Sequence, residues 1–312
     1  MKAVLLANMG APVSEKGMKV FLKLMFSDKA ILYAPTFVRF IFSSIISNLR
    51  YKSSWQKYLK IGGSPLQKSM NKMTADLQQM LNDDYVVSSV YSYSEPFITE
   101  KIAELYKQGI KDITVISMYP QASYSTTGCV QTSLDIMKQK FNAIQFQFVE
   151  DYYDNEYFIN FWLELINAKV KEMSYNKPYL LFSAHALPQS FIKRGDAYTN
   201  KMIISAEQIS QRLNLPYSVS YQSKIGRIEW TRPYTNEQLR ELAGKGINEI
   251  IIVPLSFINE NLETRYDLDM ELVPLGLDEL EIKDICRIEI PESDPHLVKM
   301  FYEFITQSNE KK

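Results

Sequence analysis

Eight short runs rich in valine, isoleucine and aromatic residues alternate with amphipathic helical patterns along most of the chain. The runs predict strands near residues 3–8, 85–91, 113–118, 144–149, 178–183, 217–221, 249–255 and 283–289. Helical patterns lie between most of them, at residues 64–81, 98–108, 130–140, 155–171, 202–213 and 235–244. This strand–helix order predicts parallel sheets covered by helices on both faces, so the expected fold class is doubly wound α/β.

The even spacing of the strands predicts two domains. Four expected strands precede residue 150 and four follow it, and 312 residues suffice for two domains of about 150 residues each. We expect an N-terminal domain at residues 1–152, a C-terminal domain at 153–312, and a ligand cleft between them. A last helical pattern at 295–305 is a candidate to pack back on the first domain.

The composition narrows the class of protein. With 46% hydrophobic residues, 23% charged residues and a net charge of -1, the chain is typical of a soluble globular protein, and nucleic acid is not expected as a partner. Cys129 and Cys286 are far apart and lack metal-ligand spacing, so neither a disulfide framework nor a cysteine-bound cluster is expected. The amino-terminal apolar run is too short for a signal peptide. These features indicate a cytoplasmic protein of unspecified oligomeric state.

The segment at residues 30–46 is apolar and aromatic, but Pro35 and Arg39 interrupt it. A membrane-spanning helix needs roughly 20 consecutive apolar residues, so this segment is not one. Three interpretations remain open: a core helix, an apolar lip over a pocket, or an interfacial helix flanked by Arg50 and Lys52.

His185 is one of two histidines and comes directly after the expected strand at 178–183. In open α/β sheets, ligands bind outside the carboxyl ends of the strands, which gives this imidazole a position suited to proton transfer. Other strand ends carry hydroxyl, amide and aromatic side chains: Met9, Tyr93, Gln222, Ser223, Trp230 and Phe257. This set is suited to a large flat ligand.

Three carboxylates follow the expected strand at 249–255. If the segment is helical, Glu263, Asp267 and Glu271 are spaced four residues apart and form one stripe, with Glu263 nearest the strand. A solvated helix face is the ordinary interpretation of such a stripe. Combined with His185, the stripe indicates either a metal site or an acid/base pair.

Two loops are candidate anion sites. Ser64 follows two glycines and is a candidate N-cap, and Pro65 suits the first helical position. The free N–H groups of such a helix start could bind an anion. Ahead of the helix at 130–140 lies a hydroxyl cluster, Ser123, Ser125, Thr126 and Thr127. Helix capping is the favoured explanation of both features. Neither a Walker A loop nor a G-x-G-x-x-G motif is present, so no nucleotide is expected.

At these positions the chain resembles the ferrochelatases, which insert ferrous iron into a porphyrin in haem synthesis. The resemblance rests on SAHALP at 183–188, YQSKIG at 221–226, PLSF at 254–257 and LETRYDLD at 262–269. The first half agrees through NMGAP at 8–12, GGSPL at 62–66, YPQ at 119–121 and STTG at 125–128. The motifs span almost the whole chain in order.

The resemblance implies two Rossmann-like, chelatase-type domains, with Fe2+ and protoporphyrin IX as substrates and release of two protons. It assigns His185 and Glu263 to metal binding and proton removal, and Asp267 and Glu271 to a route for iron or protons. Met9, Tyr93, Trp230 and Phe257 match porphyrin-pocket residues, and residues 30–46 match the lip, through which peripheral membrane contact is possible. We add Ser64, Ser123, Ser125, Thr126, Gln222, Ser223 and Asn261 as candidate substrate-binding residues.

The chain also departs from the family pattern. Asn261 stands where a histidine is common, Ser92 where a basic residue is frequent, and Ala122 where a tyrosine is frequent. No cysteine-rich extension follows Lys312, so no iron–sulfur cluster is expected. Two alternatives stay open: a chelatase for coproporphyrin III or another tetrapyrrole, and a haem or porphyrin binder without efficient insertion activity.

Overall fold

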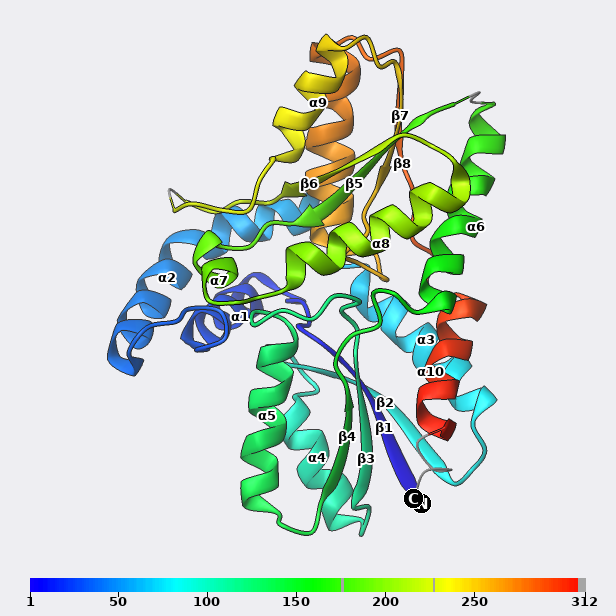
Figure 1. Cartoon of the computed structure of the whole chain (residues 1–312). Helices are drawn as coiled ribbons and strands as arrows, with labels where there is room; N and C mark the ends of the chain where they lie inside the picture. The colour runs from blue at the N-terminus through cyan, green and yellow to red at the C-terminus, as the bar shows by residue number, and fades with distance from the viewer. Residues whose placement is uncertain (175–176, 227, 308–312) are drawn as a thin grey trace. The chain divides into compact units, whose positions relative to one another are not determined.

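The chain forms two compact units in a computed structural model that describes residues 1–174, 177–226 and 228–307 (Figure 1). Unit 1 comprises Met1–Asp151 and the described part of Glu292–Lys312, and unit 2 comprises Tyr152–Pro291. Each unit contains one parallel four-stranded sheet, so the α/β prediction is confirmed.

The sheet of unit 1 has the order β2-β1-β3-β4. Its strands are β1 (Lys2–Asn8), β2 (Tyr85–Tyr91), β3 (Asp112–Ser117) and β4 (Gln145–Val149). Alternate residues Ala3, Leu5 and Ala7 of β1 join a core with α4 (Ile98–Lys107) and α5 (Thr127–Lys140). On the other face lie α3 (Leu66–Met80) and the last helix, α10 (Pro295–Gln307), which packs on α3 (Figure 1).

Unit 2 repeats this topology with the order β6-β5-β7-β8. Its strands are β5 (Tyr179–His185), β6 (Tyr217–Gln222), β7 (Glu249–Val253) and β8 (Asp284–Arg287). One face packs on α9 (Thr235–Gly244) and on the helices η1 (Glu263–Leu272) and η2 (Leu275–Glu279). Helices α6 (Glu156–Met173) and α8 (Tyr198–Leu213) lie on the other, and a short helix, α7 (Gln189–Lys193), follows β5 (Figure 1).

The strand order places a topological switch point in each unit, between β1 and β3 and between β5 and β7. In open α/β sheets, ligands bind outside the carboxyl ends of the strands at such a point. In unit 1 the Tyr119 hydroxyl, after β3, donates to Asn8 Oδ1 at the end of β1 (3.3 Å). In unit 2 the backbone N–H of His185 donates to Ser256 Oγ, which follows β7 (3.2 Å).

Two helices precede α3 and pack on each other: α1 (Glu15–Ser27), which was not predicted from the sequence, and α2 (Thr36–Lys60). Helix α2 turns small residues toward α1, because Ser43 and Ser47 are buried and Ser43 Oγ accepts from Ser27 (2.9 Å). Its large apolar residues are exposed: Phe37 (67%), Phe40 (63%), Ile41 and Ile45. The core-helix interpretation of this segment is therefore wrong.

Gly10 lies in the turn after β1, at a position where the structure leaves no room for a Cβ atom. Its φ is +91°, and a Cβ atom there would lie 2.1 Å from Ser94 Oγ and 2.9 Å from Tyr91 Cβ. We expect Gly10→Ala to lower the free energy of unfolding by about 2–4 kcal/mol, through backbone strain and overlap. Gly109→Ala is the matched control, since Gly109 has a φ of +82° but no neighbour within 4 Å. Urea unfolding compares the two, and equal losses would contradict the steric account.

Candidate active site

His185 is the last residue of β5 and lies at the switch point of unit 2, half-buried. Its Nδ1 is 2.7 Å from the carbonyl oxygen of Ala186. A carbonyl oxygen only accepts, so this contact assigns the ring proton to Nδ1 and leaves the lone pair on Nε2 of the neutral ring. Nε2 is therefore the atom that can take a proton or bind a metal ion.

The backbone of His185 is held by two hydroxyl groups that sequence reasoning missed. Ser256 accepts from its N–H, and the buried Tyr198 donates to its carbonyl oxygen (3.1 Å). Burial raises the pKa of Tyr198, so this hydroxyl stays a neutral donor at any ordinary pH. The position of Ser256 shortly after the end of β7 was the sequence signal that could have identified it. The contact itself depends on two strands that pair across 71 residues of sequence.

Gln222 ends β6, beside His185 in the strand register. The hydroxyl of Ser183 donates to Gln222 Oε1 (2.8 Å), which fixes the orientation of the amide. Nε2 is then buried, and no residue in the described part of the chain accepts a hydrogen bond from it. An unsatisfied buried N–H is costly, so this amide is a candidate donor to a bound ligand or water molecule.

Ser223 links the end of β6 to the carboxylate stripe. It adopts a left-handed backbone conformation (φ 67°), and its hydroxyl donates to Asp267 Oδ2. The structure thus brings together two sequence blocks that lie 44 residues apart. Nearby in the chain, Trp230 is buried with its indole N–H donating to the carbonyl oxygen of Ile225 (2.9 Å). Phe257, after β7, is half-buried.

The stripe lies on a π-helix rather than on the expected α-helix. Residues 263–272 form η1, and the N–H of Val273 donates to the carbonyl oxygen of Leu268, five residues earlier. With roughly 4.4 residues per turn, side chains four apart still lie within about 35° of one another. Glu263 and Asp267 are half-buried and Glu271 is exposed. The stripe therefore runs from partly enclosed to solvated, and π-helical segments are frequent at functional sites.

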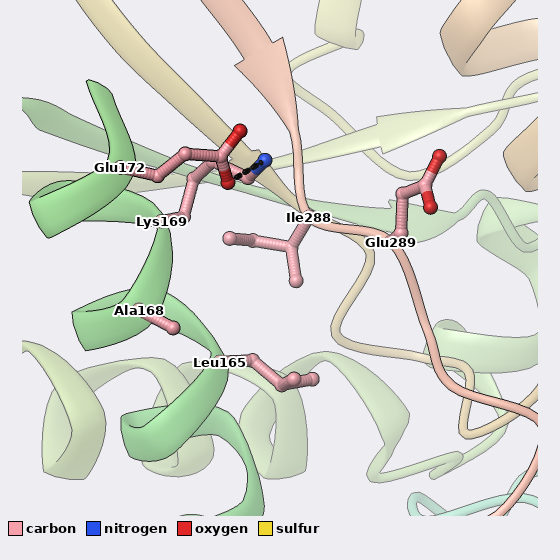
Figure 2. A pocket seen from close by; sticks show the side chains of 6 residues that line it. All are labelled: Leu165, Ala168, Lys169, Glu172, Ile288 and Glu289. Atoms are coloured by element: carbon pink, nitrogen blue, oxygen red, sulfur yellow. Dashed lines mark hydrogen bonds and ion pairs between the residues drawn. The ribbon is translucent and has the colours of Figure 1, made fainter.

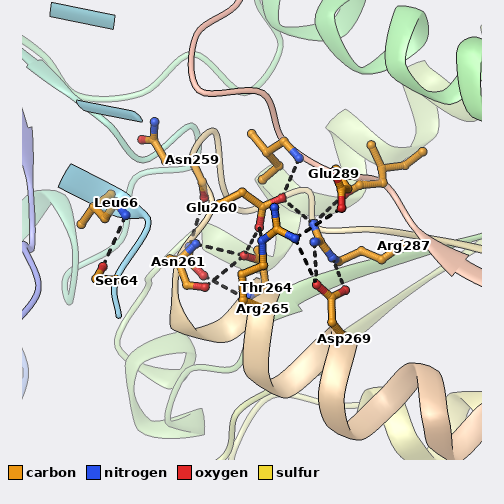
Figure 3. A network of polar contacts seen from close by, with 12 residues as sticks. Ser64, Leu66, Asn259, Glu260, Asn261, Thr264, Arg265, Asp269, Arg287 and Glu289 are labelled. Carbon is orange, nitrogen blue, oxygen red and sulfur yellow. Dashed lines mark hydrogen bonds and ion pairs between the residues drawn. The ribbon is translucent and has the colours of Figure 1, made fainter. Parts of the chain in front are cut away.

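A buried ionic network beside the stripe was not predicted (Figure 3). Arg287, at the end of β8, makes two hydrogen bonds to the Asp269 carboxylate and one to Glu260 Oε1 (2.7 Å). Burial alone would lower the pKa of Arg287, but the two carboxylates outweigh it and raise this pKa. Asp269 thus faces a structural partner and is not a member of the stripe.

Asn261 caps the helical turn before η1. Its side-chain Oδ1 accepts from the N–H of Thr264 (2.9 Å), and its Nδ2 donates to the carbonyl oxygen of Asn259 (3.3 Å). Both polar atoms of the Asn261 side chain are therefore bonded within its own loop.

In unit 1, Met9 and Tyr93 occupy the loops after β1 and β2. The backbone N–H of Met9 donates to the Tyr119 hydroxyl (2.9 Å), which ties it to the loop after β3. Tyr93 is buried, and its hydroxyl lies 2.8 Å from Asp28 and 2.9 Å from the sulfur of Cys129. Burial raises the pKa of the Cys129 thiol to about 12, so this thiol is neither a nucleophile nor a ready metal ligand.

The candidate anion loops of unit 1 are bonded locally. Ser64 Oγ accepts from the N–H of Leu66 (3.3 Å) at the start of α3. Ser123 Oγ lies 3.2 Å from Ser125 Oγ, and Thr126 directs its hydroxyl to the carbonyl oxygen of Ser123. The Ser64 contact agrees with the capping interpretation, whereas the other three hydroxyls are bonded within their loop and Thr126 makes no side-chain capping hydrogen bond to α5. Ser125 and Thr126 remain half-buried.

No group of three or more histidine, cysteine, aspartate or glutamate side chains in residues 1–174, 177–226 and 228–307 is arranged to hold a metal ion. A depression of about 480 Å³ lies elsewhere in unit 2, between α6 and the segment after β8 (Figure 2). It is lined by Leu165, Ala168, Lys169, Glu172, Ile288 and Glu289, none of which is a candidate site residue.

A family model described as ferrochelatase matches residues 1–309. A ferrochelatase of Aquifex aeolicus is 31% identical over 308 residues, covering 97% of this chain and 98% of the relative. A ferrochelatase of Rickettsia canadensis is 38% identical over 282 residues, covering 86% of this chain and 80% of the relative. Among solved structures, the sirohydrochlorin chelatase SirB from Bacillus subtilis subspecies spizizenii in complex with cobalt matches with a TM-score of 0.59 at 10% identity. It covers 99% of this chain and 96% of the other, and this likeness shows the fold alone.

Proposed function

The chain belongs to the ferrochelatase family and is an enzyme of its ferro-lyase class, and we propose that it inserts Fe2+ into protoporphyrin IX through His185 and Glu263. The observation that carries this assignment is the orientation of the His185 ring. Its Nδ1 is engaged by the carbonyl oxygen of Ala186 (2.7 Å), which leaves the Nε2 lone pair at the carboxyl end of β5.

Metal insertion requires that two pyrrole N–H groups lose their protons and that the iron loses bound water. In the neutral ring the lone pair lies on His185 Nε2, so this atom can accept the first proton. A carboxylate is a suitable second acceptor or a ligand for Fe2+, and we assign that role to Glu263.

We assign Asp267 and Glu271 to the exchange of iron and protons with solvent. Along η1 the three carboxylates change from half-buried at Glu263 and Asp267 to exposed at Glu271. The hydrogen bond from Ser223 restrains Asp267, while Glu271 meets water. A graded row of this kind suits transfer of a cation between water and a partly enclosed position.

Each unit, taken by itself, offers candidate porphyrin-binding residues. In unit 2 we assign the ring of the buried Trp230 and that of the half-buried Phe257 to apolar contacts, and the buried Gln222 amide to an N–H donor. In unit 1 we assign Met9 and Tyr93 to apolar contacts, and the hydroxyls of Ser64, Ser123, Ser125 and Thr126 to polar contacts such as those to propionates.

The exposed apolar residues of α2 favour protoporphyrin over coproporphyrin III, whose two additional propionates would favour a polar rim. The test is to measure kcat/KM for both porphyrins with Fe2+ under anaerobic conditions. We expect protoporphyrin IX to be preferred at least tenfold. A preference for coproporphyrin III would replace the assigned substrate, and binding of both without insertion would support the porphyrin-binder alternative.

We also propose that α2 contacts a membrane surface peripherally. No described helix is long and apolar enough to cross a bilayer, but Phe37, Phe40, Ile41 and Ile45 form an exposed apolar face. Residues 15–60 carry nine lysine or arginine residues and only Glu15 and Asp28 as acids, in a chain of net charge -1. Apolar residues together with excess cationic residues suit an anionic lipid surface at a cytoplasmic membrane face.

The double variant Phe37→Asp with Phe40→Asp tests this surface. We expect at least tenfold weaker binding to anionic liposomes, with the melting temperature lowered by less than about 3 °C because both rings are already exposed. Ile136→Asp is the matched control, since Ile136 is 52% exposed on α5 of the same unit. Unchanged liposome binding in the double variant, or equal loss in the control, would contradict the membrane contact.

A further inference from the structure

The segment that carries Glu263 begins with a reciprocal pair of hydrogen bonds. Asn261 Oδ1 accepts from the N–H of Thr264 (2.9 Å), and Thr264 Oγ1 accepts from the N–H of Asn261 (3.0 Å). Leu262 already has helical dihedral angles (φ -61°, ψ -42°), so Asn261 is the N-cap and Glu263 is the second residue of the helix. This arrangement is a capping box in which threonine takes the usual place of glutamate.

The cap is anchored to the buried ionic network (Figure 3). Besides accepting from Asn261, the Thr264 hydroxyl donates to Glu260 Oε2 (2.5 Å). Glu260 is only 4% exposed, and its other oxygen accepts from Arg287 (2.7 Å) and from the N–H of Ile290 (2.8 Å). The helix start is thereby connected through side chains to β8 and the segment that follows it.

Glu263 lies between the two members of this cap, so their hydrogen bonds fix the backbone on both of its sides. Asn261 uses its own polar atoms within the loop and has no group that titrates near neutral pH. We propose that Asn261 is a positioning residue, which orients Glu263 through the capping box and has no contact with the reacting atoms. This inference rests on the proposed role of Glu263.

Side chains that can cap a helix should therefore substitute for Asn261. Asn261→Ala should lower kcat about five- to tenfold with KM for the porphyrin unchanged, because loss of a cap frees the helix start. Asn261→Ser and Asn261→Asp should retain kcat within about twofold. The shape of the pH profile of kcat/KM should be the same in Asn261→Ala as in the unsubstituted protein. If Asn261 were a substrate ligand, serine and aspartate would not rescue activity and KM would rise.

A double-mutant cycle with Glu263→Gln separates this inference from the proposed function. We expect Asn261→Ala to have no further effect on kcat in the Glu263→Gln background, because Asn261 acts through that carboxylate. If the decrease in kcat of the double variant equals the product of the two single decreases, the positioning role of Asn261 is overturned and the role of Glu263 stays intact. Full activity of Glu263→Gln alone would instead show that Glu263 has no role in the reaction, and the positioning role of Asn261 would then be contradicted as well. Circular dichroism checks that each Asn261 variant is folded.

Discussion

Replacement of His185 by alanine is expected to abolish iron insertion while porphyrin binding remains measurable. The imidazole is held by Ala186 and through its backbone by Ser256 and Tyr198, so a single proton-accepting atom, Nε2, is presented at the end of β5. General base catalysis by a positioned side chain contributes about 10²–10⁴-fold, and loss of a metal ligand would add to that. Anaerobic steady-state kinetics measure the loss of insertion, and porphyrin fluorescence quenching measures binding.

The matched control is His296→Gln, at the second histidine. His296 lies at the start of α10 in unit 1, where its N–H donates to Asp294 Oδ1 (2.8 Å). We expect the insertion rate of this variant to stay within a few-fold. Full turnover of His185→Ala would remove His185 from the mechanism, and a large loss in His296→Gln would show that the wrong histidine was assigned.

Replacement of Glu263 by glutamine is expected to lower kcat by about 10²-fold or more. The amide keeps the size of the side chain but removes the carboxylate that we assign as proton acceptor or iron ligand. The helix should stay folded, because the cap at Asn261 and Thr264 does not use the Glu263 side chain. Steady-state kinetics with the melting temperature as a folding control measure this effect.

The remaining carboxylates distinguish a metal route from a solvated helix face. Asp267→Asn and Glu271→Gln should reduce kcat less than Glu263→Gln and should weaken binding of divalent ions without porphyrin. If the stripe is only a solvated face, removing a like charge four residues away should be neutral or slightly stabilising, with no kinetic effect. Asp269→Asn is a contrasting variant, because Asp269 binds Arg287 and its loss should lower the melting temperature.

The strands and most helices could be predicted because their patterns are local. Strands such as β1 and β7 are continuous runs of buried aliphatic residues, and all eight expected strands are present. The exposure of Phe37 and Phe40 could not be predicted from hydrophobicity alone, which favours burial, and it was the family resemblance that favoured a lip over a core helix. Helix α1 was missed although Ser14 is a standard N-cap, because its apolar face was not recognised. The π-helix depends on hydrogen bonds with no local sequence signal.

The sequence was sufficient to predict which strand ends carry the residues of the candidate site. Parallel strands bring their carboxyl ends to one edge, so His185, Gln222 and the residues after β7 could be grouped from sequence. The partners that orient them are not local. Ser183 fixes Gln222 across 39 residues, and Arg287 joins Asp269 and Glu260 from a separate strand. Asn261 was predicted to bind the substrate because of its position in the chain. Its capping hydrogen bonds became evident only from the structure.

The central claim is that this chain inserts ferrous iron into protoporphyrin IX and that two pyrrole protons are lost in the process. The most direct measurement mixes the purified protein anaerobically with Fe2+ and protoporphyrin IX in weakly buffered solution with a pH indicator. The claim predicts that the four visible bands of the free porphyrin are replaced by the spectrum of protohaem, with two protons released for each haem formed. Porphyrin that binds with no spectral conversion above the uncatalysed rate, and with no proton release, would contradict it.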